Sequence, residues 1–352
     1  MLRSFLKASL LVVMVSLCVC LPIVGAEGGM LDWTSPTTSW LRSVLMVSAD
    51  DGWVVGDGGT ILRWNGTEWS NVTSPTAWPI WSVFMVNASE GWAVGDGARP
   101  WRWNGASWSS VASPTTGLLY SVFMVSASDG WAVGYNILGA HGTIIHWNGA
   151  SWSNVTSPTT DYLMSVYMVD ASDGWAVGRN GTTIHWNGSS WSSVTSPITG
   201  SGFWLYSVNM VNATEGWAVG DVGTIIRWNG TEWNNVTSPT TRNLWSVFMV
   251  NASDGWAVGD DGTIIRWNGI DWTTVTSPTT SWLFSVFIVS PDDGWAVGAQ
   301  GTIIRWTGTE WIPEFPAAIL TPLLVSVTLV SVTIAETMLR RRRRPSLLSA
   351  RE

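Results

Sequence analysis

Apolar residues along this chain fall into short runs separated by turn-forming residues, and the pattern repeats about every 40 residues. Seven Ser-Pro pairs mark the repeat; they begin at residues 35, 74, 113, 157, 196, 238 and 277. Each unit holds four strand-like pieces, and a period of roughly 40 with four strands per unit is typical of β-propeller blades. The sequence therefore predicts an all-β fold, a seven-bladed β-propeller of four-stranded antiparallel blades.

The sixth unit shows the predicted strands most clearly. Residues 244–250 (LWSVFMV) are apolar on both alternating sets, as expected for an inner strand between two neighbouring blades. Three more strands follow at 256–259, 263–267 and 271–276, separated by turns rich in Asn, Asp and Gly. Antiparallel pairing places the loops after the second and fourth strands on one face of the ring, and those after the first and third on the other.

The Asn-Gly pair between the third and fourth strands predicts a two-residue turn, which defines the strand register. This register brings an arginine opposite an acid in four units, where such pairs contribute about 0.2–1 kcal/mol each. The predicted partners are Arg63 and Glu68, Arg102 and Ser107, His146 and Ser151, His185 and Ser190, Arg227 and Glu232, Arg266 and Asp271, and Arg305 and Glu310.

Both ends of the chain differ from the repeats. Residues 1–26 have a basic start, an apolar run and small residues at the end, as in a secretory signal peptide. Residues 27–312 form the predicted propeller, 313–316 (PEFP) a linker motif, 317–339 a transmembrane helix and 340–352 a basic cytoplasmic tail. The uncharged run 317–335 would rise about 28 Å as a helix. These features predict a single-pass protein of the cell membrane with an extracellular propeller.

Ring closure has one predicted clasp. Residues 31–36 (LDWTSP) look like a shortened fourth strand, while the last unit's own fourth strand is interrupted by Pro313. Since proline is poorly suited to a paired strand, we expect the N-terminal piece to pair with the last blade.

The repeat also resembles a known family. Words such as SVFMVNASDGWAVGDDGTIIRWNG (residues 246–269) are similar to the repeats of the photosystem II stability and assembly factor family and its BNR-type relatives. This resemblance implies a seven-bladed propeller with a non-enzymatic scaffold or assembly role. BNR-type relatives carry an Asp box, but Trp64 stands where its Asp would be, which argues against a sialidase. The PEFP motif resembles the start of archaeal C-terminal surface anchors.

Charge narrows the classes of partner. Residues 27–316 contain nine Arg and no Lys against 23 acidic residues. An ectodomain this acidic repels phosphate backbones, so we expect no nucleic-acid partner. The only cysteines, Cys18 and Cys20, lie in the predicted signal peptide, which excludes disulfides and thiolate sites from the exported part.

Candidate catalytic groups mostly follow the repeat, which favours a structural role. An acid precedes Gly at the end of the first turn in every unit, at Asp51, Glu90, Asp129, Asp173, Glu215, Asp254 and Asp293. These carboxylates could serve a glycosidase or bind calcium, but a repeated Asp-Gly turn explains them more simply. His146 and His185 occupy the repeat's Arg position, and the periodic tryptophans fit packing between blades. We predict no catalytic residue, metal site or cofactor.

Departures from the repeat indicate where a ligand would bind. The third unit has a longer loop after its second strand (135–141), the fifth has extra residues before its first strand (200–204), and the second reads ARPW at 98–101. All three are predicted on one face, and variable loops on a rigid scaffold commonly carry binding sites. The candidate ligand-binding residues are Arg99, Trp101, Tyr135, Asn136, His141, Phe203 and Trp204.

Asn-x-Ser/Thr sequons are frequent, and glycans on them would shield part of the surface. The candidate sites are Asn65, Asn71, Asn87, Asn154, Asn180, Asn187, Asn212, Asn229, Asn235 and Asn251. Six of them (65, 87, 187, 212, 229 and 251) are predicted on the face opposite the insertions, although Asn is also simply a preferred turn residue.

Taken together, the sequence predicts a surface-anchored propeller that binds an extracellular protein or glycan without catalysis. Two alternatives remain: an extracellular glycoside hydrolase or lyase with carboxylates at the mouth of the ring, and a structural protein of the cell envelope.

Overall fold

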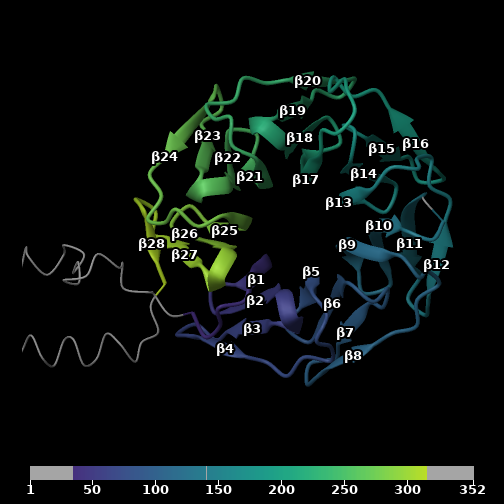
Figure 1. Ribbon diagram of the computed structural model, residues 1–352, viewed down its shortest axis with the longest axis horizontal. Coiled ribbons are helices and arrows are strands. Elements are labelled where there is room, and N and C mark those ends of the chain that lie inside the picture. Colours follow the sequence, from purple (N-terminus) through teal and green to yellow (C-terminus); the bar gives the residue numbers. More distant parts are fainter. Residues whose placement is uncertain (1–34, 140, 315–352) are drawn as a thin grey trace, which may run out of the picture. The chain divides into compact units, whose positions relative to one another are not determined.

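The computed structural model describes residues 35–139 and 141–314, which form seven four-stranded antiparallel sheets around a common axis (Figure 1). The predicted all-β, seven-bladed propeller is therefore confirmed. The predicted signal peptide, transmembrane helix and basic tail lie outside the described residues. Within the described ranges, no helix combines the length and the apolar character that crossing a bilayer requires.

Each blade is one continuous stretch of chain, and its four strands pair in sequence order. The strands are β1 Leu41–Ser48, β2 Asp51–Gly56, β3 Ile61–Trp64 and β4 Trp69–Asn71; β5 Ile80–Asn87, β6 Glu90–Gly95, β7 Trp101–Trp103 and β8 Trp108–Ser110; β9 Leu118–Ser126, β10 Asp129–Asn136, β11 His141–Trp147 and β12 Trp152–Val155; β13 Leu163–Asp170, β14 Asp173–Gly178, β15 Thr183–Trp186 and β16 Trp191–Val194; β17 Leu205–Asn212, β18 Glu215–Gly220, β19 Ile225–Trp228 and β20 Trp233–Asn235; β21 Leu244–Asn251, β22 Asp254–Gly259, β23 Ile264–Trp267 and β24 Trp272–Val275; β25 Leu283–Ser290, β26 Asp293–Gly298, β27 Ile303–Trp306 and β28 Trp311–Pro313. Short 3-10 turns, η1 Asp57–Gly59, η2 Asp221–Gly223, η3 Asp260–Gly262 and η4 Ala299–Gly301, link the second and third strands of four blades.

Burial changes from the inner to the outer strand of a blade. The second strands (β2, β6 and their equivalents) are buried along almost their whole length, because each lies inside its sheet and between two neighbouring blades. The outermost strands bury only their first residue, a tryptophan, and expose the polar residues after it. This gradient explains the sequence pattern of most blades: the second strand contains the apolar segment GWAVG, and the fourth begins with Trp followed by Ser, Thr or Asn.

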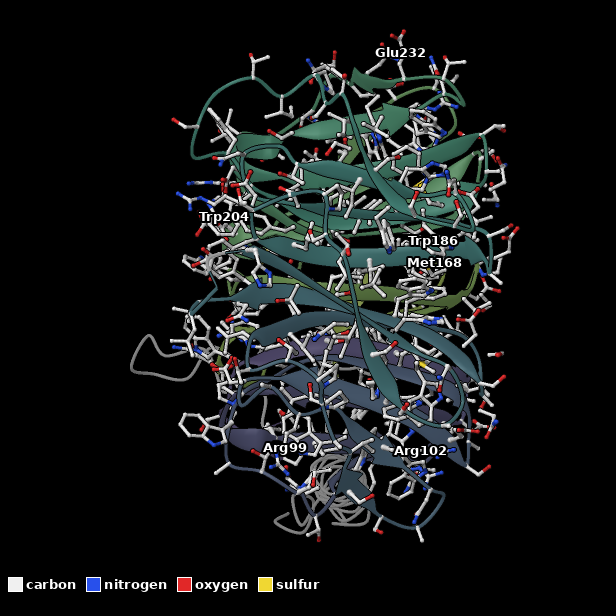
Figure 2. All side chains as sticks on the ribbon, turned by 90° about the vertical axis from the view of Figure 1, so that its right-hand side faces the viewer. Arg99, Arg102, Met168, Trp186, Trp204 and Glu232 are labelled. Carbon is white, nitrogen blue, oxygen red and sulfur yellow. The ribbon has the colours of Figure 1, made fainter. Side chains whose placement is uncertain are left out.

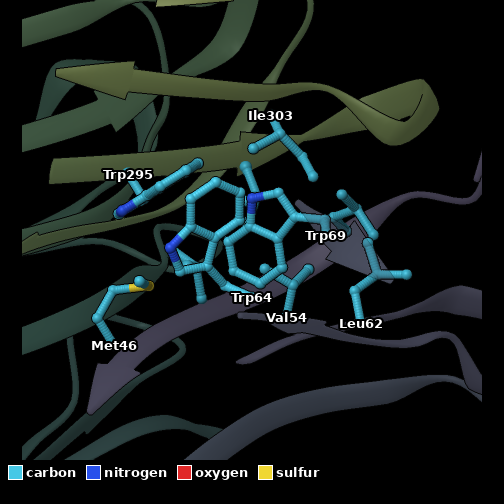
Figure 3. Close-up of a cluster of buried hydrophobic side chains, with 10 residues drawn as sticks. Met46, Val54, Leu62, Trp64, Trp69, Trp295 and Ile303 are labelled. Carbon is cyan, nitrogen blue, oxygen red and sulfur yellow. The ribbon is translucent and has the colours of Figure 1, made fainter. Parts of the chain in front are cut away.

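Tryptophan triads hold neighbouring blades together. At the interface of blades 1 and 7, Trp64 and Trp69 of blade 1 pack on Trp295 of blade 7, with ring centroids 4.8 and 5.3 Å apart (Figure 3). The same arrangement recurs at the other interfaces, for example Trp217 with Trp267 and Trp272. Burying aromatic side chains of this size contributes strongly to stability. The periodic tryptophans are thus core residues, as predicted.

Most of the predicted N-terminal clasp, residues 31–36, lies outside the described residues, while the last blade contains four strands of its own unit. The fourth strand of blade 7 is its own β28, in which Pro313 pairs with Ile304 of β27. Pro313 is tolerated there because β28 is an edge strand with no further strand to accept a bond from its nitrogen. In the described residues, the interface between blades 7 and 1 uses contacts found between all blades. They are the tryptophan triad described above and a 3.1 Å hydrogen bond from the Val44 amide to the Ser285 hydroxyl oxygen. That bond recurs at every interface.

The predicted register between the third and fourth strands was wrong by two residues. Arg63 lies opposite Ser70, not Glu68, because the connection is a four-residue loop. The side-chain oxygen of Asn65 accepts bonds from the amides of Thr67 and Glu68, and this Asx turn competes successfully with a two-residue hairpin. The other six blades share this register. For example, Arg102 lies opposite Ser109 and Arg266 opposite Thr273.

The repeated acids are the true partners of the repeated basic residues. In all seven blades the acid that begins the second strand lies within 2.5–3.0 Å of the Arg or His of the third strand. The pairs are Asp51 and Arg63, Glu90 and Arg102, Asp129 and His146, Asp173 and His185, Glu215 and Arg227, Asp254 and Arg266, and Asp293 and Arg305. The sequence therefore predicted the right kind of interaction between the wrong strands.

Candidate binding face

The two faces of the ring are built from different loops. The loops after the second strands meet those that enter the next blade: Gly59 lies against the Thr76 carbonyl, and Arg179 forms a β-bridge with Trp204. We call this the collar face. The loops after the first and third strands form the opposite face, which we call the sequon face. In Figure 2, which views the ring from the side, Trp204 lies at one face and Trp186 and Arg102 lie toward the other.

Exposed apolar side chains are concentrated on the collar face. Of the ten large hydrophobic residues that are more than about a third exposed within the described ranges, seven belong to its loops: Trp40, Trp78, Ile137, Leu138, Phe203, Val222 and Trp282. Leu138 is 88% exposed and Trp78 63%. Apolar side chains gathered on one face of a soluble domain mark a surface for contact with a partner or a membrane.

A belt of aromatic rings surrounds the axis of the propeller on this face. Each ring lies 4.2–6.4 Å from the next, measured between centroids, and the Arg42 guanidinium completes the circuit by stacking between Phe284 and Trp81. We call this belt the collar; it consists of Arg42, Trp81, Tyr120, Tyr162, Trp204, Tyr206, Trp245 and Phe284. It presents a continuous, mostly apolar surface that also carries hydrogen-bonding groups.

Carboxylates behind the collar hold its polar groups in place. Asp57 forms a two-pronged bond with Arg42, and Asp221 accepts a 2.7 Å bond from the Tyr206 hydroxyl. Asp96 and Asp260 accept bonds from the indole nitrogens of Trp81 and Trp245 in the same way. These four acids follow the second strands of their blades, so the same backbone position supplies the support each time.

Two collar tyrosines, Tyr120 and Tyr206, have pKa values raised by their surroundings. Burial, followed by the charges of Tyr162 and Asp96, raises the pKa of Tyr120 to about 12. Burial, followed by the bond to Asp221, raises the pKa of Tyr206 well above its usual value. Both hydroxyls therefore remain neutral at physiological pH and can donate hydrogen bonds.

The two insertions meet on the collar face through Tyr162. Tyr135, near the end of β10, stacks on Tyr162 with centroids 3.5 Å apart, and Trp204 packs edge-on against Tyr162 at 5.3 Å. Phe203 is exposed beside Trp204, and His141 and Arg99 are exposed elsewhere on the same face. Of the predicted ligand contacts, these residues are available to a partner.

Trp101 does not belong to this surface. It is 4% exposed and packs in the core between blades 1 and 2, where it pairs with Ala93 in the way that Leu62 pairs with Val54 in blade 1. The bulky indole replaces an aliphatic core residue, so its departure from the repeat reflects packing and not ligand binding. Asn136 is half-buried, and its side-chain oxygen accepts the amides of Leu138 and Gly139 to shape the loop.

A hollow of about 500 Å³ lies beside the third blade's insertion. It is lined by Asn136, His141 and Asn154, and by hydroxyl-bearing residues such as Thr115 and Thr143. No carboxylate lines it. The pair of closely spaced acids that a glycosidase would need is therefore absent from this hollow.

The repeated acids and the two histidines of the repeat form structural side-chain pairs. Each acid bonds to its Arg or His on the sequon face, and the imidazoles of His146 and His185 lie 2.7 Å from Asp129 and Asp173. In the described part of the chain, no three His, Cys, Asp or Glu side chains are grouped closely enough to hold a metal ion. The interpretation of these acids as simple turn residues was wrong, because they begin strands and form ion pairs.

The sequons separate by position in the fold. Six are exposed on the sequon face: Asn65, Asn187 and Asn229 in turns, and Asn87, Asn212 and Asn251 at the ends of first strands. Asn71, Asn154 and Asn235 lie on outer strands. Asn180 is different: it lies on the collar face, donates to Asp161 at 2.7 Å and accepts the Gly202 amide at 2.8 Å. Because its amide nitrogen is already bonded, Asn180 is poorly placed to accept a glycan.

The collar was not predicted as a whole from the sequence. Five of its residues (Arg42, Trp81, Tyr206, Trp245 and Phe284) occupy the second position of an inner strand, and Tyr120 aligns with them. The apolar pattern of the inner strands did not distinguish these residues, because several of them, such as Trp81, are equally suited to a buried strand. The available signal was an aromatic residue at this position in five of the seven units, where the residue type varies while its neighbours repeat.

The fold defines a class of protein: a seven-bladed β-propeller of four-stranded antiparallel blades. No protein-family model matches the chain, and no curated protein does. Similar solved structures include YCF48 bound to D1 peptide (18% identity, TM-score 0.63, covering 79% of this chain and 96% of that one) and YCF48 from Cyanidioschyzon merolae (18%, 0.63, 78% and 98%). U3-55K is also similar (11%, 0.64, 76% and 95%). At these identities the likeness shows a shared fold, and so supports the fold implied by the repeat's resemblance.

Proposed function

We propose that this protein is a cell-surface binding module that recognises a protein partner through its collar face, without catalysis. In this proposal residues 1–26 direct export, residues 317–339 anchor the chain in the cell membrane, and the propeller is extracellular. Glycans on the sequon face and outer strands leave the collar face free. The PEFP motif at 313–316 would then belong to an archaeal-type surface anchor.

One observation carries the proposal: seven of the ten exposed large apolar side chains lie on the face that also bears the aromatic collar. Tyr and Trp are enriched in protein interfaces because they bury a large apolar area while keeping a hydrogen-bonding group. The neutral hydroxyls and indoles of the collar supply both properties. The similar structure of YCF48 bound to D1 peptide supports a propeller as a protein-binding scaffold.

The test compares variants of the two faces. The exported part would be used in crosslinking pull-downs from the native cell envelope and on a glycan array. We expect Trp78→Ser and Phe203→Ser to abolish the crosslink to one identified protein. Ile270→Ser, at an 85% exposed site of the sequon face, is the matched control and should retain it. Equal binding by all three variants would refute recognition by the collar face, and binding to glycans alone would assign the face to carbohydrate.

A further inference from the structure

The chain leaves the described ring on the collar face. The amide of Glu314, directly after β28, donates to the carbonyl of Ile303, the first residue of β27, and so lies next to the η4 turn of the collar face. The predicted membrane span begins three residues later, at Ala317. Three residues reach at most about 11 Å. If this span crosses the bilayer, the collar-face edge of blade 7 must lie at the membrane surface.

The sequon face cannot reach the same membrane. An inner strand of eight residues such as β1 is about 26 Å long, and the strands run from one face to the other. A tether of about 11 Å is too short to pass around the ring. Two orientations remain: the ring stands on the edge of blade 7, or the collar face lies flat on the bilayer.

Side chains on the collar face favour the flat orientation. Its exposed apolar residues are distributed around the ring, from Trp282 of blade 7 and Trp40 of blade 1 to Leu138 of blade 3 and Phe203 of blade 5. A ring standing on one edge would leave most of them in water. Trp and Phe are suited to the interfacial region of a bilayer, where an apolar ring and a polar group are both accommodated.

Charge points in the same direction. The loops and strand ends of the sequon face carry fourteen carboxylates against five arginines, whereas those of the collar face, Glu314 included, carry seven against four in the described ranges. Moving the more acidic face away from lipid headgroups avoids desolvation and repulsion from anionic lipids. The turns with six of the ten sequons would then point outward, where bulky glycans have room.

We propose that the collar face lies flat against the lipid bilayer that holds the chain's C-terminal span, with Trp78, Leu138 and Phe203 in the headgroup region. This inference rests on the membrane anchor in the proposed function. It deepens that function, because a protein partner that contacts Trp78 and Phe203 must then itself lie in the headgroup region of the same membrane. Apolar contact, not a basic patch, provides the attraction, so docking should persist in high salt.

Single spin labels can test the orientation, because the exported part has no cysteine of its own. Leu138→Cys and Ile270→Cys would be made in full-length protein with Cys18→Ser and Cys20→Ser, and reconstituted into liposomes of uncharged phosphatidylcholine. The two sites are 88% and 85% exposed and lie on opposite faces, so each controls for the other. Flotation of the liposomes reports the anchor, and collisions of the label with oxygen and with a water-soluble nickel complex report its depth.

We expect the label at residue 138 to gain oxygen collisions and lose nickel collisions severalfold on reconstitution, while the label at residue 270 stays in water. The result should be the same in 1 M salt. A protein that floats with both labels in water overturns the docking but keeps both the anchor and the proposed protein-binding role. Immersion of both labels also overturns the flat orientation. Failure to float refutes the anchor, and the docking with it.

Discussion

In every blade the acid that begins the second strand pairs with the basic residue of the third strand. Where the third strand has Arg, the second begins with Asp or Glu; where it has His, the partner is Asp at 2.7 Å. The basic group also packs on a tryptophan: the Arg63 guanidinium lies 5.1 Å from the Trp53 ring, its neighbour across the strands. The arginines are therefore structural, and a pair at a partly exposed site contributes little to stability.

The ion pair between Arg63 and Asp51 gives a direct test of the register. In a double-mutant cycle with Arg63→Ala and Asp51→Ala, we expect a coupling of about 0.5 kcal/mol, because the side chains are 37% and 15% exposed. The free energy of unfolding in denaturant would be measured at low and high salt, and the coupling should fall in 1 M salt. If Arg63 were coupled to Glu68 and not to Asp51, the result would support the two-residue turn and its register.

Glu314 makes stability depend on pH at the last described position. It occupies the place held by Val72 in blade 1, and burial raises its pKa from 4.5 to about 7; Asp293 also raises the pKa, while Arg305 opposes the shift. An acid whose folded pKa is raised adds stability that is complete below pH 4.5 and is lost as the pH rises through about 7.

We therefore expect Glu314→Val to raise the Tm at pH 8 and to change it much less at pH 4. The gain should be small, because the side chain is only partly buried and solvent screens it. Thermal unfolding of the full chain in detergent at both pH values provides the measurement. Glu310→Gln, at an exposed loop, is the control, and an equal effect of Glu314→Val at both pH values would count against the buried carboxylate.

At the scale of the element, the blade depends on close approaches between backbones. The glycine that ends each second strand lies against the chain entering the same blade: a Cβ on Gly259 would be 2.0 Å from the Asn243 carbonyl oxygen. The φ angle of Gly259 is −162°, which any residue can adopt, so lack of space alone requires glycine here. Contacts like this one fix how the first strand lies along the second.

Gly259→Ala should therefore destabilise the propeller by about 1–3 kcal/mol, because the backbone must move to admit a methyl group. The comparison is Gly58→Asp in the η1 turn. Gly58 has a φ of +65°, but a Cβ added there would meet no atom within 4 Å, and the matching positions hold Val222 and Asp261. We expect the smaller loss for Gly58→Asp in denaturant unfolding, and the reverse order would show that φ matters more than space.

At the scale of the whole ring, blade 7 meets blade 1 as any blade meets the next. The Val44 amide bonds to the Ser285 hydroxyl at 3.1 Å, and within the ring the Val208 amide bonds to Ser165 at 3.2 Å. Closing the ring thus adds a seventh interface of the same kind. In the described residues, the tryptophan triad and the serine bond bury and pair the groups at this junction as they do at the others.

Equivalence of the interfaces predicts equal energies. Ser285→Ala and Ser165→Ala each leave a backbone N–H without its acceptor, so each should cost about 1 kcal/mol of unfolding free energy. Cooperative unfolding of both variants with the same midpoint in denaturant would confirm this. A loss for Ser165→Ala without one for Ser285→Ala would show that the ring opens easily between blades 7 and 1.

The sequence by itself determined the seven blades, the four strands in each, the tryptophan core and the face on which the insertions lie. Those features follow from local periodicity and from turn residues, which act over a few positions. The ion pairs, the fate of Trp101 and the collar were decided only by the tertiary structure. An Asx turn shifted the fourth strand by two residues, and an apolar residue such as Trp81 or Trp101 looks the same in sequence whether it packs in the core or surrounds the axis, because only contacts from neighbouring blades distinguish the two.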